Sequence, residues 1–253
     1  MVYNIYNMAT FSRPSSKKSR SKRPFLLIFA VLAFLFIIFL ILINLPKEPL
    51  STPETPAFTP TSDISILREQ MYNGSSYAYS QNYSDDYLIG VLNEWITYPE
   101  STESQSSLAI FSIYLMSIFG LTDSALAQFN SLILQDPTSS ESCELYEYRA
   151  LLASFLSEPS DSLITIKNSR DSYCKNSPVA STFPEAKSAF LKGNYTPSIF
   201  AFESLDYSTL SDEEKLFAYS VLLNHYKLTH DDSEYEKIAN NLKPLYTTQK
   251  EIH

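Results

Sequence analysis

Cysteine and histidine, the side chains that most often bind zinc, are scarce in this sequence of 253 residues. Its thiols are Cys143 and Cys174, and its histidines are His225, His230 and His253. His225 and His230 are five residues apart, which places them on different faces of a helix. No zinc-ligand spacing can be made from these residues, so the sequence indicates no metal site and no cofactor.

Carboxylate pairs occur at Asp85-Asp86, Glu213-Glu214 and Asp231-Asp232. We interpret the aspartates as helix caps and the glutamates as part of a solvated face. The sequence has no G-x-S-x-G nucleophile elbow, and its 4 glycines are too few for a phosphate-cradling loop. We therefore expect no catalytic residues and no small-molecule ligand: the chain is predicted not to be an enzyme.

Two covalent modifications are suggested by residue type. N-x-Ser/Thr sequons begin at Asn73, Asn82 and Asn194, and they can be used only if this part of the chain enters a secretory lumen. In that compartment Cys143 and Cys174 can form one disulfide, worth roughly 3–4 kcal/mol for a loop of this length. Two buried thiols are the alternative.

An apolar segment near the N-terminus predicts that these residues are tethered to a membrane. Residues 25–45 read FLLIFAVLAFLFIIFLILINL and contain no charge. As a helix they would be about 30 Å long, the thickness of a bilayer core. The run is longer than the core of a cleaved signal peptide and lacks a small-x-small cleavage site, so we predict an uncleaved transmembrane anchor.

Basic residues precede this segment. Residues 1–24 contain six of the 19 basic residues and none of the 28 acidic ones. The positive-inside rule then places residues 1–24, which we predict to be a disordered tail, in the cytosol. The rest of the chain would lie on the lumenal side of the membrane of the endoplasmic reticulum or of another secretory-pathway membrane. A mitochondrial presequence, with the body facing the intermembrane space, is the alternative. The acidic body disfavours nucleic-acid binding.

Proline punctuates residues 46–62, which we interpret as a stalk. Pro46, Pro49, Pro53, Pro56 and Pro60 block a helix and favour a semi-rigid extended spacer. Its predicted role is to hold residues 63–253 away from the bilayer.

The remaining residues, 63–253, show helical periodicity and no strand pattern. Residues 64–71 are predicted to form a short helix, followed by a loop to residue 83. Helices are then expected over 88–96, with Ser84 or Asp85 as N-cap, and over 105–119, 121–135 and 144–155. The helix over 105–119 is predicted to be a buried core helix rather than another span. Capping boxes at Thr182–Glu185 and Ser211–Glu214 begin two more helices. Asp231 begins the last, which should end near 242–244.

Two stretches share one spacing of small, aromatic and apolar residues. In FGLTDSALAQFNSLILQDP the set is Ala125, Phe129, Leu132 and the closing Pro137; in LKGNYTPSIFAFESL it is Ser198, Phe202 and Leu205, with Ala186 on the preceding helix. This pattern resembles the tetratricopeptide repeat family. The resemblance implies antiparallel helical hairpins stacked as a short solenoid, in which the aromatic fills the gap between neighbouring hairpins.

The resemblance is degenerate, because the first helix of each unit lacks the family's bulky aromatic opener and its glycine. An unrelated helical bundle is the alternative. With the anchor, the stalk and the repeat, we expect a type II membrane scaffold that contacts lipid through residues 25–45 and binds partner proteins through its lumenal helices. The alternative function is an accessory subunit of a membrane enzyme complex.

Overall fold

A computed structural model describes residues 63–175 and 179–250, all within one unit of the chain, Thr55–His253. The predicted tail (1–24), anchor (25–45) and stalk (46–62) lie outside the described residues. Within the described part every regular element is a helix and no strand occurs, which confirms the all-α prediction. In 63–175 and 179–250 no helix combines the length and apolarity needed to cross a bilayer.

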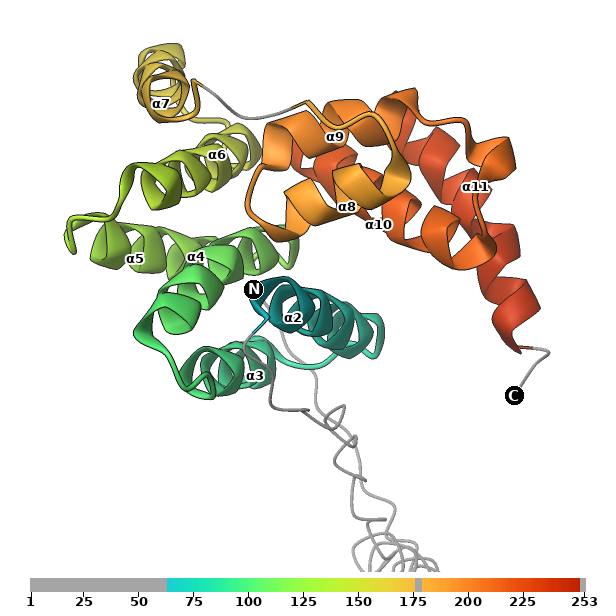
Figure 1. Ribbon diagram of the computed structural model, residues 1–253, viewed down its shortest axis with the longest axis horizontal. Coiled ribbons are helices and arrows are strands. Elements are labelled where there is room, and N and C mark those ends of the chain that lie inside the picture. The colour runs from blue at the N-terminus through green and yellow to red at the C-terminus, as the bar shows by residue number, and fades with distance from the viewer. Residues whose placement is uncertain (1–62, 176–178, 251–253) are drawn as a thin grey trace, which may run out of the picture. The chain divides into compact units, whose positions relative to one another are not determined.

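Ten α-helices and one short 3-10 helix follow one another in the described part (Figure 1). They are α2 (Ile64–Ser80), α3 (Asp85–Thr97), α4 (Thr102–Ile118), α5 (Thr122–Ile133), α6 (Ser139–Phe155), α7 (Ser160–Tyr173), α8 (Phe183–Leu191), α9 (Tyr195–Ser204), η1 (Tyr207–Thr209), α10 (Asp212–Thr229) and α11 (Asp232–Lys250).

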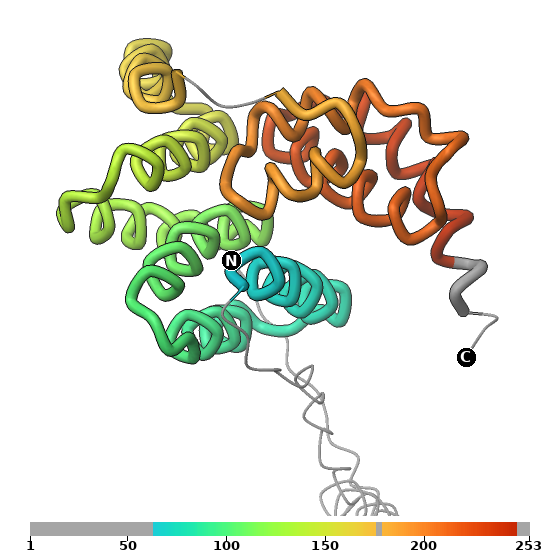
Figure 2. Tube along the Cα trace, viewed as in Figure 1, coloured from blue at the N-terminus to red at the C-terminus, as the bar shows by residue number. Residues whose placement is uncertain are grey.

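Consecutive helices pack most extensively in four pairs, α4 with α5, α6 with α7, α8 with α9 and α10 with α11; before them, α3 packs on both α2 and α4. The Cα trace in Figure 2 shows the chain doubling back between the helices of these pairs. Helix α2 and the first helices of these pairs also contact one another, including α2 with α8 and α4 with α10. In a strict solenoid a repeat contacts only its neighbours. The pairs are consistent with a repeat-like fold, but their first helices share one core.

Side-chain caps fix several helix starts where the sequence predicts them. The Ser84 hydroxyl accepts a hydrogen bond from the Tyr87 N–H at the start of α3. The Glu185 carboxylate accepts from the Thr182 N–H before α8, and Glu214 accepts from the Ser211 N–H at 2.8 Å before α10. These caps satisfy backbone donors that a helix leaves unpaired in its first turn.

The predicted loop over residues 72–83 is wrong, because α2 continues to Ser80. The run NGSSYAYS has poor helix propensity, but Tyr72, Gly74, Ser75 and Ala78 are buried along one face of this helix. Tertiary packing of that face outweighs the propensity of the individual residues.

The last helix also extends beyond its predicted end at 242–244. Pro244 lies inside α11, which continues to Lys250. Proline removes one backbone hydrogen bond and commonly ends a helix. Here Leu242 is buried and Leu245 packs against the core, so α11 stays docked on both sides of the proline.

A groove between α2 and α10

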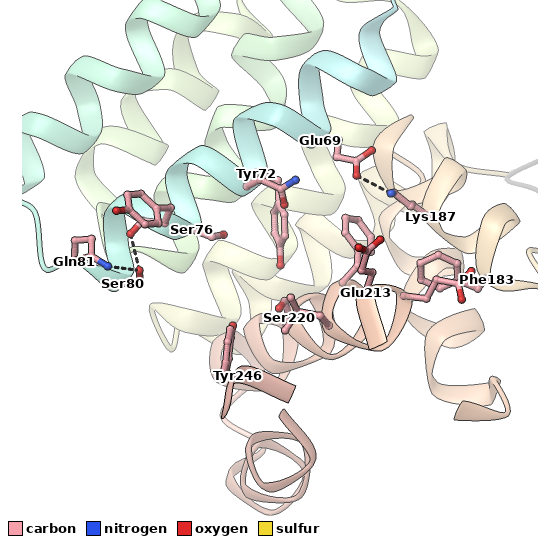
Figure 3. Close-up of a pocket in the computed structure, with 15 residues that line it drawn as sticks. Glu69, Tyr72, Ser76, Ser80, Gln81, Phe183, Lys187, Glu213, Ser220 and Tyr246 are labelled. Carbon is pink, nitrogen blue, oxygen red and sulfur yellow. Dashed lines mark hydrogen bonds and ion pairs between the residues drawn. The ribbon is translucent and has the colours of Figure 1, made fainter. Parts of the chain in front are cut away.

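A groove of about 990 Å³ lies between α2 and α10, and we call it the α2–α10 groove (Figure 3). Four helices contribute to its lining: α2 (Glu69, Tyr72, Asn73, Ser76, Tyr77, Ser80, with Gln81 at its end), α8 (Phe183, Lys187), α10 (Glu213, Glu214, Leu216, Phe217, Ser220) and α11 (Tyr246).

Helical periodicity explains how two of these walls form. The α2 residues are spaced three and four apart from Glu69 to Ser80, so they share one face of the helix. Glu213, Phe217 and Ser220 share a face of α10 in the same way. Both helices pack on α4, and α8 contacts both of them. The groove is therefore the space that α2 and α10 leave between them, with α8 and α11 completing its lining.

Tyr72 links the two walls. Its side chain is buried, and its ring lies 5.6 Å from that of Phe217 in α10 and 5.9 Å from that of Phe190 in α8. Its hydroxyl accepts a hydrogen bond from the Asn224 amide at 3.4 Å. Burial raises the pKa of Tyr72 well above its ordinary value, so the hydroxyl stays neutral and acts as a structural group rather than a base.

Two lysines connect α2 to the opposite helices. Lys187 of α8 places its ammonium 2.6 Å from the Glu69 carboxylate and 4.9 Å from the centre of the Phe217 ring. Beyond the groove, Lys227 of α10 donates to the Tyr79 hydroxyl at 2.9 Å. These contacts hold α2 at a fixed distance from α8 and α10.

A buried ion pair sets the rotation of α2. Arg68 is nearly inaccessible, and its guanidinium contacts both oxygens of Glu144 in α6, at 2.8 and 2.9 Å. It also donates to the Ser107 carbonyl of α4 at 3.1 Å. The contact at 2.9 Å is a hydrogen bond and the one at 2.8 Å an ion pair, and with the bond to Ser107 they fix the face that α2 turns to the core. With Arg68 pointing inward, Glu69 and Tyr72 are directed to the groove.

Exposed aromatic side chains border the groove. Tyr77 and Tyr246 are each 54% exposed. Tyrosine combines apolar area with a polar tip and is frequent in binding hot spots. From the sequence, Glu213 was expected on a solvated face; it is exposed, but it lies on the groove wall.

The three sequons lie in different environments. Asn82 is exposed in the turn after α2, with a left-handed φ of 56°. Asn73 is exposed on α2 and lines the α2–α10 groove, while its sequon serine, Ser75, is fully buried. Asn194 is half-buried at the start of α9, where its carbonyl accepts from the Ser198 hydroxyl at 2.6 Å. Asn82 is therefore the one of the three whose asparagine and sequon serine, Ser84, are both exposed.

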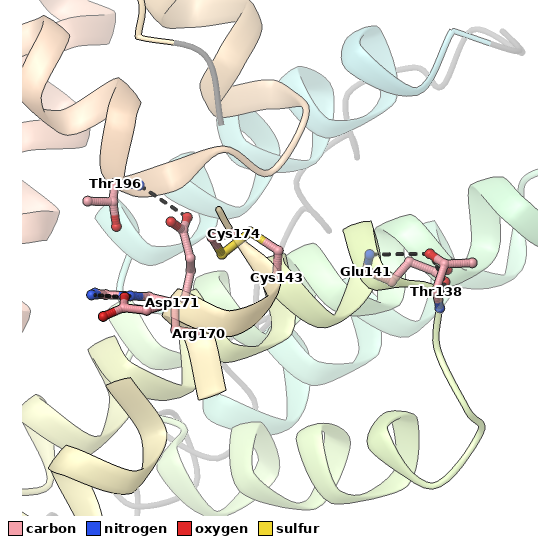
Figure 4. Close-up of a disulfide and its surroundings, with 8 residues drawn as sticks. Thr138, Glu141, Cys143, Arg170, Asp171, Cys174 and Thr196 are labelled. Carbon is pink, nitrogen blue, oxygen red and sulfur yellow. Dashed lines mark hydrogen bonds and ion pairs between the residues drawn. A yellow bond between two sulfur atoms is a disulfide. The ribbon is translucent and has the colours of Figure 1, made fainter. Parts of the chain in front are cut away.

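Cys143 of α6 and Cys174, at the end of α7, form a disulfide with their Cα atoms 5.0 Å apart (Figure 4). The Glu147 carboxylate lies beside them and accepts from the Thr196 N–H at 3.1 Å, which caps α9. Burial raises the pKa of Glu147. The side chains of Cys143, Glu147 and Cys174 are close enough to ligate one ion. Cysteine binds metals as the thiolate, however, and the disulfide leaves no thiolate at either cysteine.

Both histidines of the described chain take part in packing. His225 lies with its Nδ1 3.2 Å from the Tyr195 hydroxyl, and burial lowers its pKa. His230 ends α10 in a left-handed conformation, where its ring stacks on Phe155. They contribute to different contacts and do not form a joint site.

The repeat-pattern residues do not converge on one site; they lie at equivalent places in two helix pairs. Phe129 of α5 packs edge-to-face on Tyr146 of α6, the first helix of the next pair, and Phe202 of α9 packs on Phe217 of α10 in the same way. The small residues Ala125, Ala186 and Ser198 are fully buried. The later residues of the two patterns are buried (Leu132) or half-buried (Pro137 and Leu205).

Comparison of the chain with protein-family models, with curated proteins and with solved structures finds no match.

Proposed function

We propose that this protein is a membrane-anchored helical scaffold that binds a partner protein through the α2–α10 groove. Residues 25–45 would span a secretory-pathway membrane, that of the endoplasmic reticulum or a later compartment. The helices would then lie on the lumenal side, with the stalk setting their distance from the bilayer. The arrangement of helix pairs, which resembles tetratricopeptide repeats, would serve to present the groove.

The observation that carries this proposal is the groove itself. It is built by residues between Glu69 and Tyr246, so it exists only when the folded domain brings four helices together. Two half-exposed tyrosines, Tyr77 and Tyr246, border it, and a contact made there would bury aromatic area that water now covers.

Binding can be tested with the full chain purified in mild detergent from cells that express it. We expect partner proteins to be recovered with the wild type and lost when Tyr77 and Tyr246 are both changed to serine. Phe200 of α9 is 61% exposed and lies outside the groove, so Phe200→Ser is the matched control. Loss of the same partners with the control alone would place the binding surface elsewhere.

A second candidate is an accessory subunit of a membrane enzyme complex, in the secretory pathway or in the mitochondrial inner membrane facing the intermembrane space. The Cys143–Cys174 disulfide favours an oxidising compartment for the helical domain, and both locations provide one. Removal of N-linked glycans from the extracted protein distinguishes the locations: a mobility shift supports the secretory pathway, and its absence favours the alternative.

A further inference from the structure

We propose that reduction of the Cys143–Cys174 disulfide opens a binding site for Zn²⁺, with Cys143, Cys174 and Glu147 as its protein ligands. The site lies outside the α2–α10 groove, so this inference does not rest on the proposed function.

Three side chains of suitable chemistry converge between α6 and α7. Cys143 and Glu147 are four residues apart on α6 and share one face of that helix, and the end of α7 brings Cys174 to the same face. One ligand atom from each of the three lies within 4.8 Å of the others. Thiolate and carboxylate are both ligands that zinc takes in proteins, and three protein ligands leave the fourth tetrahedral position to water.

The spacing of these atoms is close to what a zinc ion needs. Bonds of about 2.3 Å to sulfur and about 2 Å to oxygen put the ligand atoms of a tetrahedral zinc about 3.5–3.8 Å apart, a distance that side-chain rotation can reach here. Sequence spacing does not reveal the site, because its members meet only when α7 packs on α6.

Glu147 supplies an independent argument. It is only 4% exposed, and among the described residues no ion pair involves it. The Thr196 N–H donates to its carboxylate at 3.1 Å and holds it beside the cysteines, as hydrogen bonds hold ligating carboxylates at metal sites (Figure 4). Burial raises the pKa of Glu147, because the charged form is poorly solvated there. A cation bound by the neighbouring thiolates would supply the missing counter-charge.

The ion can bind only after the disulfide is reduced. A dithiol reductant supplies two electrons and two protons: the Sγ–Sγ bond breaks, two thiols form, and the dithiol is oxidised to its own disulfide. Zn²⁺ then displaces both thiol protons to solvent and binds the two thiolates and the carboxylate.

The bound ion would replace the disulfide as the link between α6 and α7. The apolar contact beneath α7 is small, because Ile166 is the one buried residue of this helix and packs with Ala150 and Ala153 of α6. Zinc would therefore keep α7 docked in the reduced chain.

The test uses the full chain in detergent micelles, reduced with a dithiol and then freed of reductant and metal under argon. Co²⁺ is the spectroscopic probe. We expect one Co²⁺ per reduced chain to give a near-ultraviolet thiolate-to-cobalt band, which Zn²⁺ abolishes and which the oxidised chain lacks. Cys143 and Cys174 are the only cysteines in the sequence, so the band can come from no other thiolate. Zn²⁺ should also raise the melting temperature of the reduced chain and slow hydrogen exchange in α7.

Glu147→Gln tests the third ligand, because its amide oxygen can still accept from the Thr196 N–H. It should weaken Zn²⁺ binding at least about tenfold, while Asp161→Asn, an exposed carboxylate of α7 outside the cluster, should leave the affinity unchanged. Unaltered circular dichroism would show that both variants fold. Absence of the thiolate band, equal Zn²⁺ binding by the reduced and oxidised chains, or an unchanged affinity in Glu147→Gln would overturn the inference. None of these results would bear on partner binding in the groove.

Discussion

Gly193 gives the sharpest test of how the core positions the groove. It lies in the turn between α8 and α9 with φ +87°, and a Cβ added there would collide with the Glu144 side chain, the partner of Arg68. Gly120, after α4, has a similar φ of +77° and nothing within 4 Å of an added Cβ. Alanine at the two positions therefore meets the same backbone strain, but only at Gly193 does it displace a buried ion pair.

Backbone strain and overpacking determine how much each substitution lowers the free energy of unfolding. A left-handed conformation costs a non-glycine residue about 1–2 kcal/mol, and the lost freedom of the unfolded chain returns about 0.4–1 kcal/mol. Gly120→Ala should therefore lower the free energy of unfolding by about 1 kcal/mol. Gly193→Ala should lower the free energy of unfolding further, by about 1–3 kcal/mol because the site is overpacked. If the Arg68–Glu144 ion pair breaks, this additional loss becomes about 3–5 kcal/mol. We expect the difference between the two variants to be at least about 1 kcal/mol.

The assay is urea unfolding of the full chain in micelles, followed by far-UV circular dichroism and by the fluorescence of Trp95, the one tryptophan in the sequence and a buried residue of α3. Glu144→Ala removes the atoms that the new methyl group would meet, so in that background the two glycine substitutions should cost the same. Equal costs of Gly193→Ala and Gly120→Ala in the wild-type background would refute the reasoning.

Three further predictions concern other parts of the described chain. Changing Cys143 and Cys174 to serine should lower the free energy of unfolding by about 3 kcal/mol and speed hydrogen exchange in α7; unchanged unfolding would contradict a structural disulfide. Burial lowers the pKa of His225 below 6.5, so the unfolded state binds its proton first and stability should fall as the pH drops below 6.5. The loss of stability from this one group cannot exceed about 1.4 kcal/mol per pH unit. Thermal melts at pH 7.5 and 5.5 should show a smaller loss of stability for His225→Asn than for the wild type. In a secretory lumen Asn82→Gln should remove one glycan on gel electrophoresis, and no shift would argue against modification there.

Local patterns predicted much of the secondary structure. The caps at Ser84, Thr182 and Ser211 are visible in the sequence because a helix start depends on side chains within three residues. The same signature at Thr138–Glu141 marks the start of α6, but the predicted helix began only at residue 144. The loop predicted after Met71 was wrong for a different reason: burial of Tyr72 and Ala78 by distant helices is not encoded locally.

The groove could not be predicted from the sequence. Its walls combine residues that are far apart in the sequence, such as Glu69 and Tyr246, and local periodicity cannot predict that they share a groove. In the sequence, Glu213 is an ordinary first-turn carboxylate, and only the position of α2 opposite it makes it part of a groove wall. Arg68 is the clearest case of missing information. A lone arginine in an amphipathic helix suggests exposure, yet here it is buried against Glu144, 76 residues further along the chain.

The central claim is that a partner protein lies in the α2–α10 groove, and site-specific photocrosslinking in intact cells tests it most directly. A photoreactive phenylalanine analogue would replace Tyr77 in the groove or, as a control, Phe200 on α9. Both positions are exposed, so neither substitution should disturb the core. We predict a crosslinked partner from position 77 that is absent from position 200 and lost when Tyr246 is changed to serine. Crosslinks to the same partner from position 200 alone, or none from position 77, would contradict the account.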